Sequence, residues 1–165
     1  MEKLEIVLCD FNKKDLNTFI NEELKLTKSK VKSSHFYNNI TREDMEFSQV
    51  RNIEWILTPK GTGNILLDDL QIGIKLKNVI IVLSFDEQYG DIVINFPEDG
   101  VLEGDRENNK VQLIKLVNYL VDIKKNYDVQ KIIIGYEPVF DEDTLLIEIN
   151  NKEVNYDKKI EKLLS

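Results

Sequence analysis

The longest apolar stretch of the chain, residues 78–97 (NVIIVLSFDEQYGDIVINFP), contains its own turn. Two segments rich in β-branched residues, 79–85 and 92–96, flank a polar connection at residues 86–91, and every charge of the stretch lies in that connection. This pattern predicts a β-hairpin with an acidic tip. Because both segments are apolar almost throughout, we expect the hairpin to lie at the centre of a β-sheet.

The clearest helical pattern lies at residues 110–127, where Leu113, Leu116, Val117, Leu120 and Val121 form one apolar stripe. Such a stripe predicts a helix that covers one face of the sheet. We expect further helices at residues 15–26, with Asp15 as N-cap, and at 156–164, and strands at 3–9, 53–57, 65–67, 72–76, 131–135 and 145–149, the last two fully buried. Residues 41–50 fit either a helix opened by a capping box at 41–44 or a strand.

These elements predict an α+β fold with a mixed or antiparallel β-sheet, a central hairpin and helices packed mainly on one face. The chain has 165 residues and contains no Pro/Ser-rich linker and no internal repeat, so we expect a single domain over residues 1–165. Two connections interrupt the pattern. We interpret the glycine-rich residues 58–63 as a hairpin connection, since a phosphate-binding loop would lead into a helix, and residues 97–109 as a polar loop.

Four features have both a structural and a functional interpretation: Trp55, the lysines at 28, 30 and 32, Cys9 and His35. Trp55 is expected in the core or at its edge, with an interface anchor as the alternative. Lys28, Lys30 and Lys32 alternate with small residues, which favours an edge strand protected by lysines over a nucleic-acid patch, because the net charge is −8. Cys9 is expected to be a small buried hydrophobic residue. His35 is the only histidine, so no zinc site is predicted.

The sequence also limits the compartment. One cysteine allows no intramolecular disulfide, which suits a reducing environment. The N-terminal sequence MEKLE has neither the basic region nor the cleavage site of a signal peptide, and no apolar run reaches the roughly 18 residues that span a bilayer. We therefore expect a cytoplasmic protein without a membrane partner.

The negative charge is concentrated in two segments. Residues 84–105 contain seven Asp or Glu residues and residues 136–149 contain five, with no Lys or Arg in either segment. These twelve acids leave a net charge of −8 + 12 = +4 for the rest of the chain. Solubility alone is one explanation. The functional hypothesis is that the two segments come together as a single negative face that attracts a basic protein and repels nucleic acid.

Aromatic residues in the same segments supply the anchors that protein interfaces use. The candidate partner-binding residues are Asp86, Glu87, Tyr89, Asp91, Glu98, Asp99, Tyr136, Glu137, Asp141, Glu142 and Asp143. Catalysis is the competing class: a small metal-dependent hydrolase or nuclease could use the clustered carboxylates. However, GxSxG, a histidine partner for a nucleophile and the calcium-loop spacing are all missing. We therefore predict a non-enzymatic binding protein with no catalytic or metal residues and no cofactor.

Two stretches carry a resemblance to a known class of proteins. Residues 85–92 (FDEQYGDI) lead into a strand and residues 134–138 (IGYEP) precede an acidic turn. Together with the small, acidic α+β character, and a composition without alanine that is typical of AT-rich bacterial genomes, they resemble the immunity proteins encoded beside bacterial polymorphic toxins. The resemblance implies tight binding to a cognate toxin, often a basic nuclease. On this basis the carboxylates would stand where substrate phosphates otherwise sit, as in a toxin inhibitor.

Overall fold

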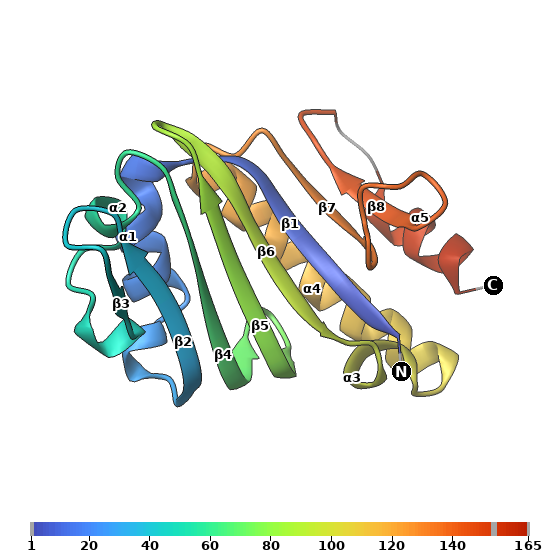
Figure 1. The fold of residues 1–165 in the computed structure, drawn as a ribbon. Coiled ribbons are helices and arrows are strands. Elements are labelled where there is room, and N and C mark those ends of the chain that lie inside the picture. Colours follow the sequence, from blue (N-terminus) through green and yellow to red (C-terminus); the bar gives the residue numbers. More distant parts are fainter. Residues whose placement is uncertain (1, 153–154, 165) are drawn as a thin grey trace.

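The computed structural model describes residues 2–152 and 155–164, and within them eight strands form one antiparallel sheet (Figure 1). The strand order is β3-β2-β4-β5-β6-β1-β7-β8. The strands are β1 (Lys3–Asn12), β2 (Val31–Asn38), β3 (Glu43–Met45), β4 (Gly61–Gln71), β5 (Lys75–Phe85), β6 (Tyr89–Pro97), β7 (Lys131–Tyr136) and β8 (Leu145–Ile149). The α+β prediction is confirmed, and the predicted central hairpin is β5–β6.

The helical elements are short except for one. They are η1 (Lys13–Asp15), α1 (Leu16–Thr18), η2 (Phe19–Glu23), η3 (Leu26–Lys28), η4 (Phe47–Gln49), α2 (Ile53–Ile56), α3 (Asp99–Leu102), α4 (Arg106–Asn126) and α5 (Tyr156–Leu163). The described helices include none that is long and apolar enough to cross a membrane.

The main core lies between one face of the sheet and the helices. The buried apolar residues of the helices, such as Leu16, Ile53 and Ile160, join this core, and α4 runs across the back of the strands in Figure 1. The predicted stripe of α4 is buried except at Val121, which is half-buried. A second, small cluster on the opposite face contains only strand and loop residues: Val7, Cys9, Ile133 and Val139, with Val93 packed against them. The helices therefore cover one face, as predicted.

The predicted strand at residues 53–57 is wrong, because this segment is the short helix α2. The Asn52 side chain accepts a hydrogen bond from the backbone N–H of Trp55 (3.0 Å), and the Asn17 side chain accepts one from Ile53 (2.7 Å). Ile53, Ile56 and the following Leu57 are buried, whereas Trp55 is 49% exposed. Trp55 is therefore neither in the core nor packed against it, which leaves an interface anchor as the remaining interpretation.

The interpretation of residues 58–63 as a hairpin connection is wrong. Gly61 and Gly63 lie inside β4, and residues 58–60 connect α2 to that strand. The β4–β5 hairpin turns at residues 72–74 instead, where Gly73 has a φ of +80° and Ile72 N–H donates to the Ile74 carbonyl (2.9 Å). Three of the residues predicted as the strand 72–76 thus form a turn, because glycine in the left-handed region reverses the chain.

Three other boundaries also differ. The predicted helix 15–26 consists of short helical pieces, and Asn12 rather than Asp15 caps the first of them. The predicted loop 97–109 contains α3 and the start of α4, which Asp105 caps through the backbone N–H of Asn108 (2.9 Å). Residues 41–50 form β3 and η4, with the capping box at Glu46 and Gln49 instead of 41–44.

The strand β8 is an edge strand whose burial alternates, so the prediction that residues 145–149 are fully buried is wrong.

The lysine-protected edge is confirmed only in part. Lys28 lies in η3, but β2 is free on one side along residues 31–35, because β3 pairs only with residues 36–38. Lys30 and Lys32 lie 4.0 and 3.0 Å from Asp68 on the neighbouring strand.

Gly63 provides a test of the packing between β2 and β4. It pairs with Phe36, and a Cβ added at Gly63 would overlap the fully buried Phe36 ring. We predict that Gly63→Ala lowers the free energy of unfolding by about 1–3 kcal/mol, because the ring must move within a packed core. Urea denaturation measures the change. Gly100→Ala is the matched control, since its Cβ would meet nothing within 4 Å; an equal loss in the control would contradict the prediction.

Cys9 is buried in the small cluster, as predicted, and burial raises the pKa of its thiol from 9.0 to about 11. Two pKa units reduce the thiolate fraction about 100-fold at pH 8, and only the thiolate is nucleophilic. We predict that iodoacetamide alkylates Cys9 at least about 100-fold more slowly in the native protein than in urea at pH 8. Mass spectrometry over time measures both rates. Equal rates would mean that the loop over Cys9 opens freely.

Candidate functional site

The hairpin tip is held rigidly at one end of the sheet. Asp86 N–H donates to the Tyr89 carbonyl (2.9 Å), which closes the turn, and Lys13 N–H donates to the Gln88 carbonyl (2.9 Å), which ties the tip to η1. These bonds satisfy backbone groups that a free tip would leave to solvent. The acidic side chains of the tip are therefore presented on a fixed backbone.

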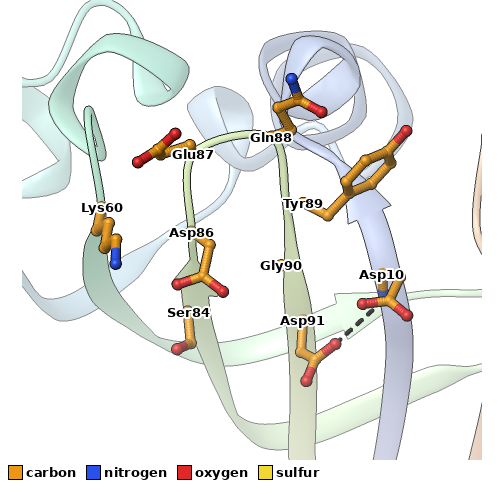
Figure 2. A pocket seen from close by; sticks show the side chains of 9 residues that line it. All are labelled: Asp10, Lys60, Ser84, Asp86, Glu87, Gln88, Tyr89, Gly90 and Asp91. Carbon is orange, nitrogen blue, oxygen red and sulfur yellow. Dashed lines mark hydrogen bonds between the residues drawn. The ribbon is translucent and has the colours of Figure 1, made fainter.

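A polar hollow of about 570 Å³ opens beside this tip (Figure 2). Its lining contains four carboxylates, Asp10, Asp86, Glu87 and Asp91, and one cation, Lys60 at the start of β4. Asp10 has a φ of +53°, and its backbone N–H donates to Asp91 Oδ1 (3.1 Å), drawn as the dashed line in Figure 2. The irregular end of β1 thus turns toward β6 and brings Asp10 into the acidic group.

A buried lysine lies under the same end. Lys13 is 3% exposed, and its Nζ donates to the carbonyls of Leu57 and Pro59, both at 3.1 Å. Burial lowers the pKa of Lys13, while the nearby carboxylates of Glu54, Asp86 and Glu87 act in the opposite direction. Lys13 therefore stabilises the α2–β4 connection by hydrogen bonds to two of its carbonyl groups. Because its ammonium group is buried, the exposed surface of the hairpin tip still carries Asp86 and Glu87.

The second acidic segment forms a different end of the molecule. Tyr136 Oη donates to Glu98 Oε2 (2.8 Å), which joins the end of β7 to the residue after β6. Burial raises the pKa of Tyr136 to about 12, and the bond to Glu98 adds to this effect. Tyr136 is therefore a neutral donor at physiological pH, and Glu98 remains an acceptor.

The loop at residues 137–144 is fixed by its own hydrogen bonds. Val139 is buried, and its backbone N–H donates to Glu5 Oε2 (3.3 Å). Thr144 Oγ1 donates to the Asp141 carbonyl (2.9 Å). Outside this frame, Asp141, Glu142 and Asp143 are exposed, and Phe140 is 64% exposed. The loop thus presents three carboxylates and one aromatic side chain to solvent.

The prediction that the two acidic segments come together is wrong. In the register of the sheet, Asn12 of β1 pairs with Tyr89 of β6, and Lys3 of β1 pairs with Pro97. The hairpin end carries Asp86, Glu87, Tyr89 and Asp91, and the opposite end carries Glu98, Asp99, Tyr136, Glu137, Asp141, Glu142 and Asp143. The length of β6, nine residues or about 30 Å, separates the hairpin tip from Glu98 and Asp99. Asp91 lies within β6, and the loop at 137–144 folds back onto the sheet through Val139.

Lys60 lines the hollow at the hairpin end and Lys13 is buried beneath it, but no lysine or arginine of the described residues forms an ion pair with a carboxylate of the predicted set. Ion pairs between the described residues involve Asp68, Asp44, Asp69, Glu161 and Glu148 instead. Within the same residues, no group of three or more His, Cys, Asp or Glu side chains is arranged to hold a metal ion. The described site thus presents carboxylates that no ion pair of the described residues neutralises.

Sequence reasoning missed four residues of the hairpin end: Asp10, Lys13, Glu54 and Lys60. Asp10 follows an apolar strand directly, which is a detectable signal, but its positive φ and its turn toward Asp91 depend on the tertiary structure. Lys13 gives no signal, because lysine is rarely buried. Lys60 reaches the hollow only because β4 pairs with β5, with Gly61 opposite Phe85.

Comparison with known proteins identifies the family. No curated protein matches the sequence. The fold is similar to a chain of the 1.75 Å crystal structure of the toxic C-terminal tip of CdiA from Pseudomonas aeruginosa in complex with immune protein, with a TM-score of 0.67 and 18% identity over 93% of this chain and 97% of that chain. A family model described as PABL017 Cdi1I immunity protein matches residues 2–152. The chain therefore belongs to the PABL017 Cdi1I immunity protein family, which confirms the predicted resemblance to immunity proteins and a non-enzymatic, toxin-neutralising function.

Proposed function

We propose that this protein acts in the cytoplasm, where it binds the toxic C-terminal domain of a CdiA-type protein, and that its two acidic ends attract and orient that domain. The observation that carries the proposal is the set of carboxylates on rigid backbone at both ends that no ion pair of the described residues neutralises. Support for the class of partner comes from the similar fold in a complex of a CdiA toxin tip with immune protein.

The electrostatics favour a basic partner. Seven carboxylates of the candidate set lie within the hairpin tip, β6 and the loop at 137–144, where Asp86, Glu87 and Asp141 are all exposed. A toxin domain that binds nucleic acid carries a positive surface, and a complementary negative surface increases the rate of encounter. Fixed carboxylates also lose little conformational entropy on binding, because the hydrogen bonds of the hairpin tip and the loop already hold their backbone.

The charge contribution of each end can be measured separately. We predict that Asp86→Asn/Glu87→Gln/Asp91→Asn and Asp141→Asn/Glu142→Gln/Asp143→Asn each slow association with the toxin domain by about tenfold at low salt. The salt dependence of association should also become weaker, because fewer charges are screened. Stopped-flow or surface plasmon resonance measurements with the toxic C-terminal domain of a CdiA-type protein give the association rate and its salt dependence.

The matched control removes the same number of negative charges from the helical side. Glu107→Gln/Asp122→Asn/Asp157→Asn changes exposed residues of α4 and α5. We expect this variant to associate at close to the wild-type rate. If all three triple variants slow association equally, only net charge matters, and if none does, the acidic ends serve solubility alone.

A further inference from the structure

An apolar row crosses the face of the sheet that the helices leave uncovered. Val82 of β5 pairs with Val93 of β6, Val93 pairs with Val7 of β1, and Val7 pairs with Ile133 of β7. Side chains directly opposite in adjacent strands share a face, so these four form one continuous row. Their neighbours on each strand point into the main core, which fixes the row on the opposite face.

Only part of this row is covered. Val139 from the loop at 137–144 packs on Val7, Cys9 and Ile133, which are all buried. Toward β4 the row is open: Val82 is 36% exposed, and Leu66, Ile80 and Val93 are half-buried. Leu66 and Ile80 pair directly, next to Val82 on the same face. The uncovered part, Leu66, Ile80, Val82 and Val93, is called the open apolar patch below.

Carboxylates border the open apolar patch in both strand directions. Asp91 lies two residues before Val93 on the same face of β6, and it belongs to the acidic hollow at the hairpin end. Toward the other end, Glu5 on β1 lies across from Asn95 and accepts the backbone N–H of Val139, at the base of the acidic loop. The two separated acidic ends thus border one common face.

We infer that the open apolar patch is the centre of the contact with the toxin domain, and that the two acidic ends are its rim. An apolar centre surrounded by polar groups is the general anatomy of protein interfaces. The occupant that fits is a basic domain with an apolar surface ringed by Lys or Arg, because the rim on this side carries Asp91 and Asp86, and Val139 holds the base of the acidic loop at 137–144 on the same face. The inference rests on the proposed function, and it adds that the toxin domain binds the face of the sheet that the helices leave uncovered.

The test compares two exposed valines on opposite sides of the protein. Val82→Lys places a charge at the centre of the open apolar patch, whereas Val111→Lys makes the same change on the solvent side of α4, where Val111 is 47% exposed. We expect Val82→Lys to weaken binding of the CdiA-type toxin domain at least tenfold, mainly through faster dissociation, and Val111→Lys to bind like the wild type. Thermal melts verify that both variants fold.

A milder variant covers the case in which Val82→Lys does not fold. Val82→Thr keeps the branched shape and the strand preference, and the loss of one buried methyl group should weaken binding about fourfold. If folded Val82→Lys and Val82→Thr both bind like Val111→Lys, the inference is wrong, although slower association of the charge variants would still support the proposed function. If the wild type does not bind the toxin domain at all, the proposed function fails and the inference fails with it.

Discussion

The register of β6 between β5 and β1 is the constraint on which the rest of the structure depends. It places Val93 between Val82 and Val7 on the open face. The side chains of Ile92, Ile94 and Phe96 lie on the opposite face and pack in the main core. A slip of one residue would expose those core side chains and bury the polar ones, so the pairing is strongly specified. The same register determines which face the helices cover, which face stays open and at which end each acidic segment emerges.

The elements that could be predicted are those with long, regular apolar patterns. The helix α4 has a periodic apolar stripe, whereas the hairpin strands and β7 are short runs rich in β-branched residues and bounded by polar or glycine-containing connections. Residues 53–57 could not be assigned, because four apolar or aromatic residues in five fit both structures. Two side chains cap α2: Asn52, directly before the helix, accepts the Trp55 N–H, and Asn17, from a distant segment, accepts the Ile53 N–H. Asn52 is a local signal, and only the cap from Asn17 leaves no local pattern.

The candidate site shows a different limit. Composition shows where the carboxylates lie along the chain, but their position in space depends on the direction in which each strand runs. Asp91 and Glu98 are close in sequence and lie at opposite ends of β6, whereas Glu98 and Tyr136 are distant in sequence and share a hydrogen bond. Charge summed over a segment contains no information on strand direction, so the prediction of one cluster had no physical basis beyond the number of acids.

Separation of the acidic ends suits a binding protein better than a single cluster would. Charges about 30 Å apart are separated by several Debye lengths at physiological salt, so their mutual repulsion costs the free protein little stability. A standard protein interface buries about 800 Å² on each partner, which corresponds to a patch roughly 30 Å across. One toxin domain seated on the open face could therefore contact both ends at once. The length of β6 thus keeps the carboxylates apart in the free protein while leaving them within reach of one partner.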